Sequence, residues 1–251
     1  MKIIDAHMHP FSKEEENLKW YGEKSSDFAT IKEDMERAGI PLICGSVIIK
    51  GKQGKEALIG ANESALSLYK ENPDFYLPGI VIHPEFKEES CEYIKKAHDM
   101  GLKLIGELTP YTCGWKCYMS AQEIFEYADS LDMTVSCHPT PTEDMHKFAE
   151  SFPNMEIVYA HPGEHAVLEA NIEILKKYDN TYIDLSGSGV QRYGTIRKLI
   201  NEVGKERILF GTDYPICNPA TYISAMLYEN LTDDELEHIF YKNAERVYGI
   251  G

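Results

Sequence analysis

Eight short apolar runs alternate with helix-forming segments along almost the whole chain of 251 residues. Near-continuous apolar runs of this length are typical of parallel strands that are buried on both faces. The segments between them space their apolar residues as a helix does. After the opening stretch Lys2–Pro10, the runs predicted to contain strands are Pro41–Ile49, Tyr76–His83, Leu102–Leu108, Met133–His138, Met155–His161, Thr181–Leu185 and Arg207–Gly211.

This alternation predicts an α/β protein in which a helix connects each strand to the next in a parallel sheet. Eight repeats, in a chain close to the usual ~250 residues, favour a closed (β/α)8 TIM barrel over an open doubly wound sheet. The first run is not followed by the G-x-G-x-x-G turn that a dinucleotide-binding sheet would carry. No change in composition marks a linker, so we expect a single domain over residues 1–251.

Polar side chains occur where several of the predicted strands end. His7 and His9 end the first strand with one residue between them, so in an extended backbone both imidazoles point the same way. In TIM barrels the active site lies at the carboxyl ends of the strands, so side chains from distant strand ends should share one mouth. Imidazoles and carboxylates suit a divalent metal ion. The later strand ends carry His83, Glu107, His138, His161 and Asp213.

Composition narrows the classes of partner. The net charge of −16 argues against a broad nucleic-acid surface, because such surfaces are built from lysine and arginine. No apolar run is long enough to span a bilayer, and no signal peptide precedes the first strand, so we expect a cytoplasmic protein without a membrane partner. The six cysteines are scattered, so we expect free thiols. The expected partner is a small-molecule substrate, with a homodimer as a candidate assembly.

The chain resembles the amidohydrolase superfamily of metal-dependent (β/α)8 barrels, and within it the amidohydrolase-related branch that includes the aminocarboxymuconate-semialdehyde decarboxylases. The resemblance spans the chain from end to end. It rests on Ile4-Asp-Ala-His-Met-His-Pro10, Ser136-Cys-His138, Tyr159-Ala-His-Pro162, Leu209-Phe-Gly-Thr-Asp-Tyr-Pro215 and Asn243-Ala-Glu-Arg-Val-Tyr-Gly249.

The resemblance implies that His7, His9 and Asp213 hold a first metal ion, usually Zn²⁺, with His138 and His161 nearby. Binuclear members of the superfamily bridge two ions with a carboxylate or a carboxylated lysine on the fourth strand. Glu107 is the better bridge, because Lys103 lies four residues, or ~13 Å, deeper along the strand. We therefore expect one or two divalent ions, with two favoured.

The expected reaction is metal-dependent hydrolysis of a small-molecule amide, ester, lactone or phosphoester. A metal ion lowers the pKa of bound water, and Asp213 then acts as the general base, with His161 as a second catalytic residue. Asp5 is expected to orient one of the strand-one histidines. The alternative is a non-oxidative decarboxylase with one ion, and a third hypothesis is a catalytically silent binding protein.

Four further residues are predicted to bind substrate. His83 ends the third strand, and the loop after the fourth strand carries two aromatic side chains that could contact substrate. A glycine-rich turn after the seventh strand precedes an arginine that could hold an anionic group. The polar segment Ser12–Asp27 is expected to be a functional loop because it follows the two histidines. The predicted substrate-binding residues are His83, Tyr111, Trp115 and Arg192.

Overall fold

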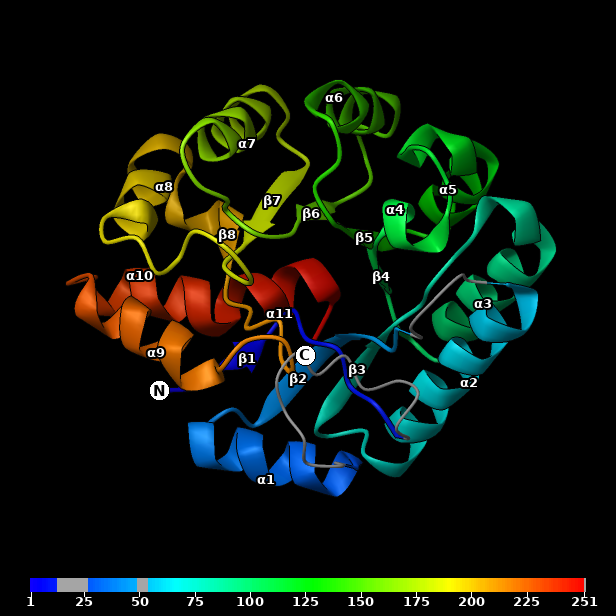
Figure 1. Ribbon diagram of the computed structural model, residues 1–251, viewed down its shortest axis with the longest axis horizontal. Helices are drawn as coiled ribbons and strands as arrows, with labels where there is room; N and C mark the ends of the chain where they lie inside the picture. The colour runs from blue at the N-terminus through cyan, green and yellow to red at the C-terminus, as the bar shows by residue number, and fades with distance from the viewer. Residues whose placement is uncertain (13–26, 49–53, 251) are drawn as a thin grey trace.

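The computed structural model describes residues 1–12, 27–48 and 54–250. Most of the predicted loop Ser12–Asp27 therefore lies outside the described residues. The strands lie at the centre of the molecule and the helices surround them (Figure 1). Among the described residues, no helix combines the length and apolar composition needed to cross a membrane.

Eight parallel strands form two sheets that together make the barrel. One sheet has the order β1-β2-β3 and the other the order β4-β5-β6-β7-β8. Adjacent strands pair in parallel throughout both sheets. The strands are β1 Ile4–Asp5, β2 Leu42–Ser46, β3 Tyr76–Gly79, β4 Leu104–Leu108, β5 Thr134–Cys137, β6 Ile157–Tyr159, β7 Thr181–Asp184 and β8 Ile208–Leu209.

Backbone hydrogen bonds join the two sheets at both seams. Between β3 and β4, the Ile80 N–H donates to the Leu104 carbonyl at 3.0 Å, and the Gly106 N–H donates to the Ile80 carbonyl at 2.8 Å. Between β8 and β1, the Ala6 N–H donates to the Phe210 carbonyl at 2.8 Å. These bonds close the sheet into the predicted TIM barrel, so all eight carboxyl strand ends face one mouth.

The outer helices confirm much of the predicted alternation. The apolar spacing of the sequence predicts helices over residues 28–38, 55–71 and 142–151, and the structure has these bounds in α1 Phe28–Ala38, α2 Lys55–Glu71 and α6 Thr142–Ser151. The remaining longer helices are α3 Lys87–Asp99, α5 Gln122–Asp129, α7 Ala166–Lys177, α8 Thr195–Val203 and α9 Pro219–Tyr228. Short helical turns are α4 Pro110–Cys113, η2 Pro84–Phe86, η3 Tyr118–Ala121 and η4 Lys205–Arg207.

The sequence pattern predicts a terminal helix over residues 232–248 but misses the helix α9 Pro219–Tyr228. The helix α9 begins with Asn218 as N-cap, whose side chain accepts a hydrogen bond from the Ala220 N–H, and with Pro219 in the first turn. The predicted terminal helix consists of α10 Asp233–Glu237, the π-helical turn η5 His238–Lys242 and α11 Asn243–Tyr248. The start of α10 has a capping box formed by Thr232 and Glu235.

The helix α11 closes the barrel at the end opposite the mouth. Its apolar side chains pack in one buried cluster with Ile4 of β1, Leu104 of β4 and Val158 of β6. The Tyr248 hydroxyl donates to the Ala6 carbonyl at 3.2 Å, which anchors the helix beneath the first strand. The barrel is therefore a packed core rather than a pore, and a substrate can approach the strand ends from one side only.

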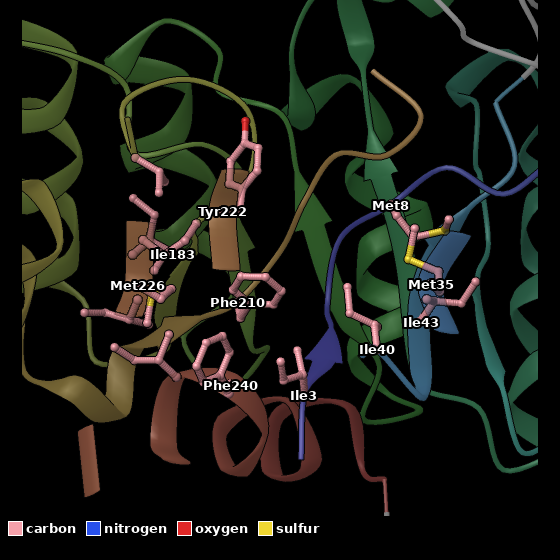
Figure 2. Packing of buried hydrophobic residues seen from close by; sticks show 14 of the residues in the cluster. Ile3, Met8, Met35, Ile40, Ile43, Ile183, Phe210, Tyr222, Met226 and Phe240 are labelled. Atoms are coloured by element: carbon pink, nitrogen blue, oxygen red, sulfur yellow. The ribbon is translucent and has the colours of Figure 1, made fainter. Parts of the chain in front are cut away.

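A larger cluster of buried residues fills the space between the barrel and the helices near both chain ends. Phe210 packs on Phe240 of η5 with ring centroids 5.0 Å apart, and Figure 2 shows Ile3 beside the same ring. Ile183 of β7 lies near Tyr222 and Met226 of α9 in the same view. Burying each such side chain contributes about 1.5–3 kcal/mol, so this packing fixes β1, β7 and β8 relative to one another.

Gly79 offers a test of the seam between the two sheets. A Cβ atom built at Gly79 would lie 1.8 Å from the backbone carbonyl oxygen of Gly106 on the neighbouring strand. The substitution Gly79→Ala must therefore push β3 and β4 apart, and overpacking of this kind costs about 3 kcal/mol. We expect thermal unfolding to show a melting temperature lower by roughly 6–12 °C.

Gly54→Ala is the matched control, because a Cβ atom there would meet nothing within 4 Å. Its melting temperature should stay within about 4 °C of the native value. Equal melting temperatures for the two variants would contradict the close approach of β3 and β4.

Candidate metal centre

Five of the predicted ligand residues meet in one buried group at the mouth of the barrel. The His9 Nε2 atom lies 3.3 Å from Glu107 Oε2 and 3.4 Å from Asp213 Oδ1. The His7 Nε2 atom lies 3.5 Å from Glu107 Oε2 and 3.8 Å from Asp213 Oδ1. The His161 Nε2 atom lies 3.7 Å from Glu107 Oε1. Side chains separated by more than two hundred positions thus surround one small space.

Two overlapping sets of ligand atoms have the spacing of a metal site. In each set, one atom per residue lies within 4.8 Å of the others. The first set is His7, His9 and Asp213, and the second is His7, Glu107 and His161. Because both sets contain His7, they describe adjoining parts of one centre.

Hydrogen bonds on the far side of each imidazole aim its Nε2 atom at the centre. The Nδ1 atom of His7 lies 2.8 Å from Asp184 Oδ2, and that of His9 lies 3.1 Å from the Ser46 carbonyl. The Nδ1 atom of His161 lies 2.9 Å from the Ser186 hydroxyl. Partners of this kind orient histidine ligands in metal sites.

The local backbone also supports this arrangement. His161 and Asp213 have φ values of +64° and +60°, a left-handed conformation that is uncommon outside glycine. The Asp213 N–H donates to the His7 carbonyl at 2.8 Å, which holds the turn after β8 against the turn after β1. A Cβ atom at Gly187 would lie 2.3 Å from His161 Nδ1, so only glycine leaves room for the ring.

The buried carboxylates favour a positive charge in this space. Burial alone would raise the pKa of Glu107, but the neighbouring His7 and hydrogen bonds from His138 hold that pKa well below its usual range. Burial alone would lower the pKa of His9, but hydrogen bonds to Asp213 and Glu107 raise it to about 9. The carboxylates thus stabilise positive charge on the imidazoles, and a divalent ion can supply that charge in place of protons.

An unpartnered atom supports the same conclusion. Among the described residues, His7 Nε2 is one of two buried side-chain polar atoms without a hydrogen-bond partner. A buried polar atom left unpaired is costly, and metal coordination is one way to satisfy an imidazole nitrogen. The donor set of imidazole nitrogens and carboxylate oxygens suits Zn²⁺ and Mn²⁺ alike. The residues therefore fit a divalent metal ion.

His138 lies beside the centre but is engaged differently. Its Nδ1 atom lies 2.8 Å from Glu107 Oε1, and its Nε2 atom lies 3.3 Å from the Tyr111 hydroxyl. Both ring nitrogens thus have partners, and His138 is absent from both sets of ligand atoms. Tyr111 is 62% exposed and lies edge-on to the His138 ring, so it reaches the rim of the mouth.

His83 and Arg192, which were also predicted to bind substrate, already have hydrogen-bond or ion-pair partners in the protein. The His83 Nε2 atom lies 3.0 Å from the Cys113 carbonyl, and its Nδ1 atom accepts from the Glu85 N–H at 3.2 Å. Arg192 is ion-paired with Glu164 at 2.9 Å, and its side chain is 65% exposed. Neither residue directs a free polar atom at the metal centre.

Trp115 is buried rather than placed over the mouth as a stacking surface. It is 6% exposed, and its indole Nε1 is the second buried atom without a partner among the described residues. It lines a cavity of about 10 Å³ together with Ile82, Leu108 and Glu107. This cavity, which has room for about one water-sized group, adjoins the metal centre through Glu107.

Sequence reasoning missed Asp184 and Ser186, which orient His7 and His161. Asp184 lies near the end of the predicted seventh strand and Ser186 directly follows that strand, so the rule that singled out the other strand ends could have found them. Asp5 was expected to orient an imidazole, but its carboxylate instead accepts from the backbone N–H groups of His7 and Thr212. Asp5, Asp184 and Ser186 are all completely buried.

The placement of Lys103 agrees with the choice of Glu107 as the strand-four candidate. Lys103 is ion-paired with Asp132 near the opposite end of the barrel, and both side chains are exposed. All six cysteines lie among the described residues and none of them forms a disulfide bond, as expected.

Solved structures with the same fold include decarboxylases and a hydrolase. A 2,6-dihydroxybenzoate decarboxylase from Rhizobium matches with a TM-score of 0.76 and 16% identity, over 99% of this chain and 98% of that chain. A dihydroxybenzoic acid decarboxylase from Polaromonas was solved with bound manganese and the inhibitor 2-nitroresorcinol. It matches with a TM-score of 0.66 and 15% identity, over 99% of this chain and 97% of that chain. A probable 2-pyrone-4,6-dicarboxylic acid hydrolase from Acinetobacter baumannii was solved with citric acid bound. It matches with a TM-score of 0.66 and 15% identity, over 99% of this chain and 100% of that chain.

These comparisons correct the predicted reaction. The prediction of a hydrolase is wrong, because the similar solved structures are mostly decarboxylases, and they favour the alternative that the sequence left open. The physical reason for the error is that a set of metal ligands does not by itself distinguish hydrolysis from decarboxylation.

A search of curated protein sequences found no match. The family model described as amidohydrolase, in contrast, matches residues 4–250, which is nearly the whole chain and includes every residue of the metal centre. The chain therefore belongs to the amidohydrolase family.

Proposed function

We propose that the protein is a non-oxidative decarboxylase that uses one divalent metal ion and acts on a small hydroxylated aromatic carboxylic acid. The observation that carries the proposal is a single compact centre, since both sets of ligand atoms share His7 and exclude His138. The full-length likeness to two dihydroxybenzoate decarboxylases supports the substrate class.

His7, His9 and Asp213 would hold the ion, with Glu107 and His161 next to it. When bound, the ion supplies positive charge that stabilises the anionic oxygens of a hydroxyaryl carboxylate. Manganese or zinc satisfies the proposal.

In the proposed reaction, the Asp213 carboxyl group delivers a proton to the ring carbon that bears the carboxylate. The bond between that carbon and the carboxylate then breaks, its electron pair restores the aromatic ring, and CO₂ leaves. Asp213 regains its proton from solvent water before the next turnover, and His161 is the second residue proposed for proton transfer. The position of Asp213 Oδ1, 3.4 Å from His9 Nε2, keeps this carboxyl group directed into the centre.

Two aromatic residues are proposed to contact the substrate. Tyr111 lies at the exposed rim, where its hydroxyl contacts His138. Trp115 lines the buried cavity beside Glu107, where its free indole N–H can donate to an oxygen substituent of the substrate or to a bound water molecule.

Metal content tests the single-ion proposal. We expect purified protein reconstituted with Mn²⁺ or Zn²⁺ to retain one equivalent per chain after removal of free metal, measured by elemental analysis. His7→Ala should retain much less than one equivalent, because both sets of ligand atoms lose their shared member. His98→Ala on the exposed face of α3 is the control and should bind as the native protein does. Two tightly held equivalents per chain would contradict the proposal.

Activity tests the role of Asp213. Metal-loaded protein should release CO₂ from a hydroxybenzoate, with 2,6-dihydroxybenzoate as the first probe and 5-carboxyvanillate as the second. Asp213→Asn should lower kcat by about 10²-fold or more, because the amide cannot deliver the proton. The assay must be run at saturating metal, with bound metal measured in parallel.

Asp179→Asn is the matched control, since that carboxylate is fully exposed and distant from the centre, and its kcat should be unchanged. Absence of CO₂ release from any hydroxybenzoate by metal-loaded protein would remove the proposed substrate class. Full activity of metal-loaded Asp213→Asn would remove the proposed proton donor.

A further inference from the structure

The buried hydroxyl of Ser186 contacts three polar groups in the loop after β7. Its Oγ atom lies 2.9 Å from His161 Nδ1 and 3.1 Å from His7 Nδ1. It also makes a short hydrogen bond to Asp184 Oδ1. Ser186 is 0% exposed, so water does not replace these contacts. The hydroxyl has a single proton to share among the three neighbours.

That proton belongs on the bond to Asp184. Asp184 Oδ2 lies 2.8 Å from His7 Nδ1, and backbone N–H groups face Asp184 Oδ1, so both oxygens of this carboxylate are placed as acceptors. Asp184 Oδ1 already accepts from the Ser186 N–H at 3.0 Å and lies 3.4 Å from the His161 N–H. An oxygen in this position requires a donor from Ser186 Oγ, because two acceptor oxygens at such a short separation would repel each other.

The Ser186 oxygen is therefore left as an acceptor toward both imidazoles. His7 Nδ1 has Asp184 Oδ2 as its closest acceptor, at 2.8 Å. His161 Nδ1 has Ser186 Oγ as its partner, and it can complete that hydrogen bond only when it carries the ring proton.

We infer that Ser186 is a positioning residue that holds neutral His161 in the tautomer with its proton on Nδ1. The Nε2 lone pair then faces the metal centre, where it can bind a cation or accept a proton. The catalytic meaning of this assignment rests on the proposed function, but the assignment itself needs neither metal nor substrate.

Contacts on the other side of the ring do not favour the opposite tautomer. A proton on Nε2 would face Glu107 Oε1 at 3.7 Å, which is longer than a hydrogen bond. That oxygen already has His138 Nδ1 at 2.8 Å. Gly187 packs against the ring so closely that a Cβ atom would lie 2.3 Å from His161 Nδ1, which leaves the ring little freedom to move away from Ser186.

The tautomer can be read directly by ¹⁵N NMR of the histidine rings in metal-free protein at about pH 8, where an ordinary imidazole is neutral. The His161 signals are identified by their loss in His161→Asn. We expect the native protein to show the proton on Nδ1 of His161. A proton on Nε2 would overturn the inference, and this reading does not depend on the folding of any variant at Ser186.

Ser186→Ala tests the role of the hydroxyl. We expect the His161 signals to shift toward the tautomer with the proton on Nε2, and the affinity for Mn²⁺ or Zn²⁺ to fall about 10–100-fold, as for other residues that orient metal ligands. A folded Ser186→Ala protein in which His161 keeps its proton on Nδ1 would overturn the inference.

Ser90→Ala is the matched control. Ser90 is also completely buried, and its hydroxyl donates to the Phe86 carbonyl away from the metal centre. The Ser90→Ala variant should leave both the His161 tautomer and the metal affinity unchanged. It therefore distinguishes general destabilisation of the protein from loss of the Ser186 hydroxyl. A native protein with the expected tautomer but without decarboxylase activity would reject the proposed function and leave this inference standing.

Discussion

The contact between His7 and Asp184 is the interaction on which the rest of the centre depends. Both side chains are buried, and their 2.8 Å hydrogen bond fixes the ring so that its other nitrogen faces Glu107 and Asp213. Buried carboxylates are costly unless they are paired. Glu107, Asp184 and Asp213 are three such carboxylates around the His7 ring. Positive charge in this space would therefore stabilise them, and one divalent ion would supply it.

The barrel brings these charges together because the ladders of β1 and β8 stop before three of the candidate ligands. His7 and His9 follow β1, which ends at Asp5, and Asp213 follows β8, which ends at Leu209. Beyond the ladder the backbone is free to turn, as the left-handed conformation of Asp213 demonstrates. The turns are nevertheless tied together, since the Asp213 N–H donates to the His7 carbonyl. These candidate ligands thus stand on short loops that a packed barrel holds in place.

The sequence was sufficient for the fold and for much of the centre because both follow from position along a strand. Strand ends meet in a closed barrel, so His9, His161 and Glu107 could be grouped without knowledge of their contacts. Side-chain partners are different, because they depend on rotamers and on neighbours from other loops. The ion pair between Arg192 and Glu164 could not be read from a glycine-rich turn, nor could the burial of Trp115 in its loop. The prediction of hydrolysis rather than decarboxylation was wrong for a related reason. The reaction depends on the substrate and on the residues that bind it, and the metal ligands alone do not specify these.

The contact between His138 and Glu107 supports the proposal of one ion rather than two in this centre. A bridging carboxylate must offer one oxygen to each ion, and the second ion would need His138 and His161 as further ligands. In the structure, Glu107 Oε1 is instead 2.8 Å from His138 Nδ1, and His138 Nε2 is directed to Tyr111. A second ion would have to break both contacts and turn the His138 ring. Glu107 Oε2, in contrast, already faces His7 and His9, so the carboxylate can serve the first ion while its other oxygen remains bound to His138.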